Sequence, residues 1–522
     1  MDVNNCIKAI QGTPTGLFKF RVTAQEKITC IIELAQYADK YMDSVILFAT
    51  RDGASHVQKT AAGAIRTRFN ELKDVRAVEE RMSELLLKKM DPAFWSDTLP
   101  VDEAVALVSI ASVNRNGYVR QAALGQMART PDLRFVPYII RRTGDWVPHL
   151  RTLAMQVLAG YKVAEFRKGF LCAIPDIESL LKVKRVNLQP VYSEVMQWLV
   201  CDVEPAHLLA EVQHLGEASR FRIVRYLLAE HSCGQVMLKS FLADRSFLIR
   251  LCAVRHLAKL SEEWTIKLFE SALHDYFPNI RRIALKELIR RDRADSPMLS
   301  FSLTDPSFDV RDMAAKRLGL SRDALVVHFR EHLKAGKRMV GSLLGLRDAN
   351  GKEHVADILP FTAHTDPLVR QAALLALADL APDKANDAAL LMVVDTNKRI
   401  RTKAAALLIK RHDRAVVEHA QALMASEQVM HRLTGLSLLN KFGGWDPLPN
   451  TIRACLDDSP RVAEQAWINL NAWVVYARGL FTEAPSQDVE KARSALAHVR
   501  SELSQPTYAQ QRSLDAVQVF ID

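Results

Sequence analysis

The chain has 522 residues, 49% of them hydrophobic, which is enough to bury a large core. Glycine and proline number only 20 each, too few for a strand-and-turn protein of this length, so the composition favours an all-α fold. The net charge of +10 is modest for this length, and it excludes a surface that is uniformly basic.

Residues 1–48 are predicted to form two helices that cap the N-terminal end of the fold. No basic segment followed by an apolar one opens the chain, and the apolar run at residues 45–49 is too short to span a membrane. The seven cysteines are scattered without a Cys-x-x-Cys pair, as in a reducing compartment. We therefore expect no membrane span and a cytoplasmic protein.

From residue 49 onward, a short phrase recurs about every 31 residues, a period typical of arrays of helical hairpins. An Asp or Asn and a few turn-forming residues precede an apolar residue and Arg, and Ala and Leu follow on the same helix. Because one hairpin leaves its apolar face uncovered, such hairpins stack on their neighbours. In the clear copies the apolar reference residue stands at Val119, Leu150, Ile249, Ile280, Val310, Val369, Ile400 and Val462.

The phrase is interrupted in the first half of the chain. Repeats of the helical hairpin are predicted over residues 49–160, where residues 64–90 should contain one long charged helix. Residues 161–220 lack the phrase but keep helical patterns. We expect irregular or degenerate helical repeats there, with a longer loop near Pro175 or Pro190.

The repeats are predicted to resume over residues 221–476, and residues 305–318 show how one unit is built. Asp305 is expected to accept N–H groups of the first helical turn, and Pro306 suits the first helical position. Val310, Met313, Ala314 and Leu318 are spaced by three and four, so they should form one buried stripe. Residues 477–522 are expected to form a C-terminal helical cap or tail that covers the last repeat.

The repeated phrase resembles the HEAT repeat, and its short period looks most like the HEAT-like repeats of bacterial proteins named after phycobilisome lyases, also seen in alkylpurine DNA glycosylases. The resemblance implies an α-solenoid, a superhelix of HEAT-like helical hairpins in which the Val-Arg helix is the inner one. It also implies Asp–Arg ladders between adjacent repeats, formed by Asp244, Asp275 and Asp305 with Arg250, Arg281 and Arg311. It does not identify a function, because the same repeat serves scaffolds, adaptors, lyases and DNA-binding proteins.

Most enzyme signatures are missing from the sequence, which has no P-loop, no dinucleotide-binding glycine pattern and no cysteine-rich zinc spacing. One short match is the H-x-x-E-H order of inverzincin metallopeptidases, which would make His328 and His332 metal ligands on one helix face. Both histidines also lie at the edge of a core stripe, where surface side chains are common. We therefore expect no metal and no cofactor.

Charged residues give the clearest indication of function. The places two, six and ten after each reference residue lie opposite the core stripe, because an α-helix repeats every 3.6 residues. In the central repeats these places hold Arg255, Lys259, Arg282, Lys286, Arg290, Asp312 and Lys316, and nearer the C-terminus the sixth place holds Leu375 and Ile468. The pattern predicts a concave groove with a basic centre and an apolar end, although ordinary solvated helix faces carry charges as well.

The favoured interpretation is a non-enzymatic protein-binding scaffold or adaptor that holds an acidic, partly apolar partner segment on its concave face. The alternative is a nucleic-acid-binding protein that uses the central basic strip, since the sequence pI is about 9.2. A lyase or another enzyme with a site hidden from sequence inspection is the third reading. A mixed basic and apolar groove would favour a peptide, whereas an unbroken basic channel would favour nucleic acid.

Overall fold

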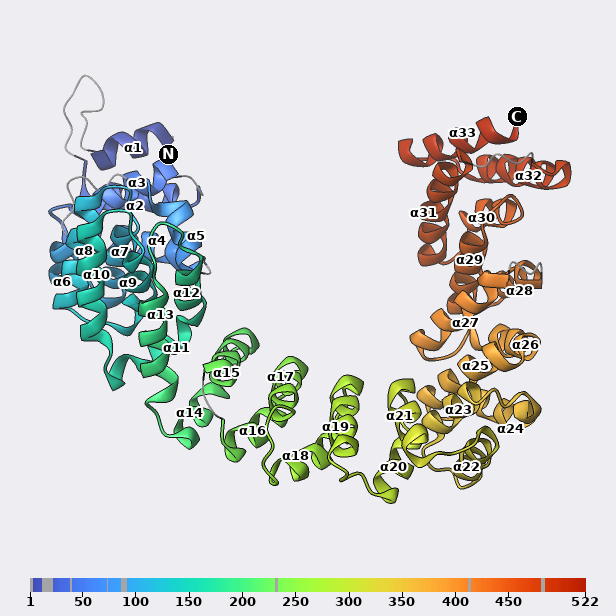
Figure 1. Ribbon diagram of the computed structural model, residues 1–522. Coiled ribbons are helices and arrows are strands. Elements are labelled where there is room, and N and C mark those ends of the chain that lie inside the picture. Colours follow the sequence, from blue (N-terminus) through green and yellow to red (C-terminus); the bar gives the residue numbers. More distant parts are fainter. Residues whose placement is uncertain are drawn as a thin grey trace. The chain divides into compact units, whose positions relative to one another are not determined.

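The computed structural model describes residues 3–11, 22–37, 40–72, 74–85, 92–230, 233–411, 415–479 and 484–522. Within these ranges the chain is helical and contains no strand, so the predicted all-α fold of helical hairpins is confirmed. The chain forms two compact units, Met1–Leu268 and Phe269–Asp522. Figure 1 shows that consecutive hairpins lie side by side in chain order within each unit.

The N-terminal unit contains α1 (Val3–Gln11), α2 (Ala24–Leu34), α3 (Lys40–Ala49), α4 (Ser55–Asn70), α5 (Val75–Met82), α6 (Pro92–Thr98), α7 (Val101–Ser112), α8 (Gly117–Arg129), α9 (Val136–Thr143), α10 (Pro148–Tyr161), α11 (Arg167–Cys172), α12 (Ile174–Ser179), α13 (Gln189–Met196), α14 (Pro205–Val212), α15 (Glu217–Glu230), α16 (Gln235–Leu242) and α17 (Phe247–Leu257). Short turns of other helix types are η1 (Leu133–Phe135), η2 (Ala164–Phe166), η3 (Leu180–Lys182) and η4 (Gln197–Cys201). Helix α18 (Thr265–Ala272) spans the boundary between the units.

The C-terminal unit contains α19 (Pro278–Arg290), α20 (Ser296–Leu303), α21 (Phe308–Leu318), α22 (Arg322–Lys334), α23 (Met339–Asp348), α24 (Val355–Ile358), α25 (Pro367–Leu380), α26 (Pro382–Met392), α27 (Lys398–Arg411), α28 (Ala415–Met424), α29 (Val429–Phe442), α30 (Leu448–Ala454), α31 (Pro460–Ala477), α32 (Ser486–Glu502) and α33 (Tyr508–Ile521), with short turns η5 (Lys352–His354) and η6 (Leu359–Ala363). Successive odd-numbered helices from α19 to α31 contact one another and form one layer. α19, α21, α25, α27 and α31 each carry one of the clear copies of the repeated phrase.

The apolar stripe of the phrase forms the core, as predicted. On α19, Ile280, Ala284 and Leu288 are completely buried. Their spacing of four residues places them on one face of the helix, and the small Ala in the middle lets the neighbouring helix approach closely. On α21, Val310 and Ala314 are buried, whereas Met313 and Leu318 of the predicted stripe are only half-buried.

The Asp–Arg ladder is present and has a two-sided geometry. Arg281 on α19 donates from Nε and Nη2 to the two carboxylate oxygens of Asp305, at 2.7 and 2.8 Å. Its Nη1 donates to the backbone carbonyl of Asp275 at the start of its own repeat, at 2.6 Å. The same two-pronged contact joins Arg120 to Asp145, Arg220 to Asp244, Arg370 to Asp395 and Arg432 to Asp457. Each Arg therefore clamps its own loop and the loop of the hairpin that follows.

The ladder changes at several places. The Nε of Arg311, expected to pair within the regular register, instead donates to Asp348 at the end of α23, at 3.1 Å. In the repeats of α25 and α29, His364 and Ser426 stand where most repeats carry Asp, and neither side chain has the two carboxylate oxygens of a two-pronged contact. On α31, Ala463 occupies the place of the Arg, so this repeat has no ladder arginine that could pair with a later loop.

The predicted capping role of Asp305 was wrong in detail. Its Oδ1 accepts the N–H of Ser307 at 2.7 Å, which closes a turn in the loop, and α21 begins afterwards at Phe308. Pro306 consequently precedes the helix. In other repeats a proline does occupy the first helical position, as Pro278 does in α19. The Asp is therefore a loop residue that organises the turn and receives the Arg.

The N-terminal unit departs from the predicted elements in three respects. Residues 1–48 contribute to three helices, α1, α2 and α3, rather than two. The long helix expected over residues 64–90 is divided, because α4 ends at Asn70 and α5 begins at Val75; residues 86–90 of that prediction lie outside the described residues. The longer loop in the irregular segment lies at residues 183–188, whereas Pro175 and Pro190 are both helical.

The last two helices pack on the final repeat. α32 contacts α30, and α33 contacts α31. Leu496, Val517 and Ile521 join the same buried cluster as Val462 of α31. Throughout the described ranges, no helix combines the length and the apolar character needed to cross a membrane.

Candidate functional site

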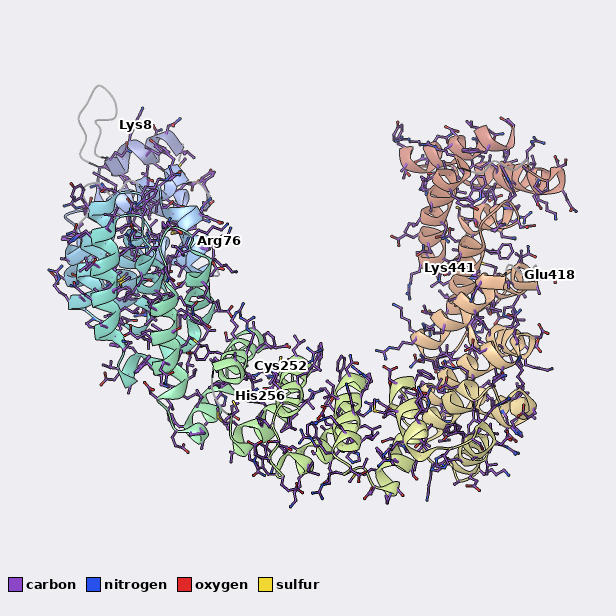
Figure 2. All side chains as sticks on the ribbon, viewed as in Figure 1. Lys8, Arg76, Cys252, His256, Glu418 and Lys441 are labelled. Atoms are coloured by element: carbon purple, nitrogen blue, oxygen red, sulfur yellow. The ribbon has the colours of Figure 1, made fainter. Side chains whose placement is uncertain are left out.

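The predicted basic residues are distributed over both units. Arg255 and Lys259 belong to the N-terminal unit, where Arg255 lies on α17, the helix on which Figure 2 labels Cys252 and His256. Arg282, Lys286 and Arg290 lie on α19 and Lys316 lies on α21, in the C-terminal unit. All are exposed except Arg282, which is half-buried. Of the four residues on α19 and α21, Arg282 and Lys316 line a groove between the two helices, whereas Lys286 and Arg290 are not part of its lining.

The α19–α21 groove has a volume of about 630 Å³ and is lined by Arg282, Ile289, Asp309, Asp312, Met313, Lys316 and Arg317. Ion pairs bridge the two helices at either end. Arg282 Nε lies 3.9 Å from a carboxylate oxygen of Asp309, and Arg317 Nη2 lies 2.5 Å from Asp292 just beyond α19. Half-buried apolar side chains, Ile289 and Met313, lie along the same groove.

Carboxylates from the same helices neutralise part of the predicted basic strip. Arg290 donates to Glu287 at 2.7 Å, and Lys316 donates to Asp312 at 2.7 Å. Lys286 is exposed and has no ion pair with any carboxylate in the described part of the chain. The groove is therefore a mixed surface of basic, acidic and apolar side chains with a small basic excess, not an unbroken basic channel.

A second, apolar hollow lies on the other side of α21, between α21, α22 and α23. It has a volume of about 120 Å³, and Phe308, Leu325 and Phe329 contribute its apolar lining. Gly345 of α23 is required there, because a Cβ at this position would stand 2.5 Å from the ring of Phe329. Asp312 lines this hollow as well as the α19–α21 groove, so the two surfaces are continuous across α21.

The predicted apolar end of the groove is only partly exposed. Leu375 on α25 is half-buried, whereas the side chain of Ile468 on α31 is 54% exposed. Val475, seven residues further on the same helix, is 70% exposed and shares the face of Ile468. The exposed apolar surface near the C-terminal end therefore belongs to α31.

His328 and His332 lie on α22 with their ring centroids 4.4 Å apart. His332 Nδ1 is 3.0 Å from the carbonyl oxygen of His328, and burial, followed by the neighbouring His332, lowers the pKa of His328. Glu331, the acid of the motif, is exposed. Zinc sites use at least three protein ligands, and no cluster of three or more His, Cys, Asp or Glu side chains suited to a metal occurs among the residues described.

Sequence inspection identified the basic residues but missed most of the groove. Asp309 and Arg317 flank it, and Ile289 and Met313 supply its apolar side chains. Met313 had been assigned to the core stripe because its spacing fits that stripe, yet it is half-buried and reaches the groove. One feature of the sequence indicated a mixed surface: α21 carries the acidic residues Asp309 and Asp312 as well as basic residues.

Comparison with known proteins yields fold-level neighbours only. No family model matches the chain, and no curated protein matches it. Among solved structures, importin beta aligns with 99% of this chain and 73% of its own, at 14% identity and a TM-score of 0.34. A subunit of the S. pombe condensin Cnd3-Cnd2 subcomplex aligns with 99% of this chain and 95% of its own, at 12% identity and a TM-score of 0.31. Kap121p bound to Ste12p aligns with 99% of this chain and 56% of its own, at 12% identity and a TM-score of 0.25. At such low scores these similarities carry no argument about function.

Proposed function

We propose that the protein is a non-enzymatic binding scaffold that holds an acidic, partly apolar protein segment in the α19–α21 groove. The observation that carries this proposal is the composition of the groove: three cations, two carboxylates and two apolar side chains line one continuous surface. Helical and extended segments of partners are recognised by surfaces of this mixed kind.

The apolar side chains and the uncompensated charge have separate roles in this proposal. Ile289 and Met313 receive an apolar side chain of the partner, and the hollow beside Phe329 offers a second anchor across α21. Lys286, exposed on α19 one turn from Arg282 and without an ion pair in the described residues, attracts acidic residues that flank the anchor, while Lys316 lines the groove and is paired with Asp312. The partner's acidic residues compete with Asp309 and Asp312 for the same cations, which limits affinity and makes the binding reversible.

The carboxylates disfavour nucleic acid as the ligand. A phosphate backbone places a negative charge at every nucleotide, and such a backbone laid along the groove meets Asp309 and Asp312. A protein segment can place neutral or basic residues opposite these two acids. Nucleic acid therefore stays the alternative, to be separated from protein by experiment.

The test compares affinity purification from the native host with wild-type protein, a Lys286→Glu/Lys316→Glu variant and a Lys267→Glu/Lys334→Glu control. The control makes the same charge change at exposed lysines of α18 and α22, outside the groove. We expect one or more proteins to be recovered with wild type and control and lost with the groove variant. Recovery that is equal in all three would reject the groove as the binding site.

The purified partner then decides between the two ligand classes. For a protein ligand, the groove variant should mainly slow association, since steering charges act on the encounter rate. For nucleic acid, wild-type affinity for a 20-nucleotide single strand should fall steeply with salt, with a slope of roughly −0.7 per phosphate contact, and the variant should lose part of that slope. A steep slope of this kind would replace the protein-binding proposal.

A further inference from the structure

A second large surface lies in the N-terminal unit. Helices α4, α5, α7, α9 and α12 enclose a cleft of about 1240 Å³, here called the N-terminal cleft. Phe69 of α4 and Tyr138 of α9 line it and stack with their ring centroids 6.2 Å apart. The cleft exceeds the range of about 300–1,000 Å³ that small-molecule pockets occupy. Its size is therefore that of a site for part of a protein chain.

Tyr138 carries a polar group into this cleft without a partner. Its side chain is only 6% exposed, and it lines the cleft. No hydrogen bond to its hydroxyl is found within the described ranges. The hydroxyl oxygen itself is not buried, so it is accessible from the cleft. A hydroxyl that has no partner and faces a cleft is positioned to bind a group that enters it.

Two carboxylates share the surroundings of that hydroxyl. Asp74 caps α5 by accepting the N–H of Ala77 at 2.8 Å, and Asp176 is a half-buried residue of α12. Burial, and then the charges of Asp176 and Asp74, raise the pKa of Tyr138, and all three residues line the same cleft. No ion pair of either carboxylate is found in the part of the chain that the structure describes.

The arginines that line the cleft are already engaged by other carboxylates. The pairs are Arg66 with Glu103 at 2.9 Å, Arg76 with Glu80 at 2.9 Å, Arg134 with Asp132 at 2.7 Å, Arg141 with Glu79 at 3.0 Å and Arg222 with Glu178 at 2.6 Å. Arg76, labelled in Figure 2, is the most exposed of them, with 81% of its side chain accessible. Among the charged residues that line the cleft, Asp74, Asp176 and Lys182 are therefore the ones without an ion pair in the described part of the chain.

We propose that the N-terminal cleft binds a protein segment through a lysine or arginine side chain, whose positive group is held by Asp74 and Asp176 while its stem lies against the ring of Tyr138. A cation over an aromatic face is attracted by the ring quadrupole. The tyrosine hydroxyl accepts an N–H of the same cation, and the two carboxylates supply charge-assisted hydrogen bonds. This site lies in the other unit and selects the opposite charge, so it is independent of the α19–α21 groove.

The test selects a displayed library of random twelve-residue peptides on the full-length wild-type protein, with counter-selection on an Asp74→Asn/Asp176→Asn variant. Asn caps helices about as well as Asp, so the variant keeps the cap of α5. An Asp97→Asn/Asp323→Asn protein, changed at exposed acids outside the cleft, is the matched control. Each enriched peptide is resynthesised with citrulline, which is neutral, in place of its arginine.

We expect the enriched peptides to share a lysine or arginine. The citrulline exchange and the Asp74→Asn/Asp176→Asn variant should each weaken binding by roughly tenfold or more, as expected for an anchor residue, and the control should bind like wild type. Tyr138→Phe, which removes only the hydroxyl, should weaken binding by a smaller factor without altering the fold. The proposal is overturned if no peptide is enriched, if the peptides lack a basic residue, if the citrulline peptide binds equally well, or if free arginine amide binds as tightly as the peptide.

Discussion

Replacing Asp176 by Asn should stabilise the protein at alkaline pH. Burial, followed by the charge of Asp74, raises the pKa of Asp176 from 3.8 to about 6, while Arg141 acts in the opposite direction. A displacement of about two pKa units corresponds to roughly 3 kcal/mol. Because Asp176 is only partly buried, solvent screens part of this unfavourable interaction. We therefore expect Asp176→Asn to raise the free energy of unfolding by about 1–2 kcal/mol.

The sign of the pH dependence follows from proton binding. Between about pH 4 and pH 6 the folded protein holds a proton on Asp176 that the unfolded chain has released, so stability falls as the pH rises through this window and stays reduced above it. Asn carries no charge at any pH. The gain from Asp176→Asn should therefore be full at pH 8, smaller at pH 5 and nearly absent at pH 3.5.

Urea unfolding at these three pH values measures the effect, with hydrogen exchange of α9 and α12 as a local readout because the two units need not unfold together. Asp97→Asn is the control, since that carboxylate is exposed and should change stability by less than about 0.5 kcal/mol. A gain that is the same at all pH values, or a loss of stability at pH 8, would refute the argument. A carboxylate that lowers stability at neutral pH is more readily explained by binding than by folding.

Other parts of the fold give further expectations. Arg281→Ala leaves the buried carboxylate of Asp305 without its ladder partner, so unfolding free energy should fall by about 3–5 kcal/mol, with loss of hydrogen-exchange protection first in α19 and α21. Gly341→Ala would drive a methyl group into the carbonyl of Thr304 and should lower the melting temperature strongly, whereas Gly63→Ala, with open space around its Cβ, should stabilise α4 by about 0.5–1 kcal/mol. Purified protein should contain far less than one equivalent of zinc by mass spectrometry of the metal, and a stoichiometric amount would contradict our interpretation of α22.

Much of the fold could be predicted because the repeated phrase encodes interactions within one hairpin and between adjacent hairpins. The buried stripe at Ile280, Ala284 and Leu288 follows from helical periodicity alone. The ladder contact of Arg281 with Asp305 was implied by the resemblance to HEAT repeats, and the structure contains it. Arg220, just before the predicted resumption of the array, makes the same contact although its repeat lacks most of the phrase.

The binding surfaces were harder to predict, because they combine residues that are distant in sequence. Asp74, Tyr138 and Asp176 belong to three elements of the N-terminal unit, and two of them lie where the phrase is absent or interrupted. The basic strip was overestimated for a different reason. Periodicity places Lys316 on the solvent side, but it does not reveal that Asp312, one turn earlier, neutralises the ammonium group.

The ladder gives the array a direction. In each pair described, the Arg reaches toward the C-terminus, to an Asp that is 24 or 25 residues later in the regular repeats. While the ribosome is extending the chain, a hairpin that carries this Arg therefore exposes its guanidinium until the loop of the next hairpin has been made. The contact between two such neighbours forms only after the second has emerged, and on α31, where Ala463 replaces the Arg, the hairpin makes no such contact toward the C-terminus.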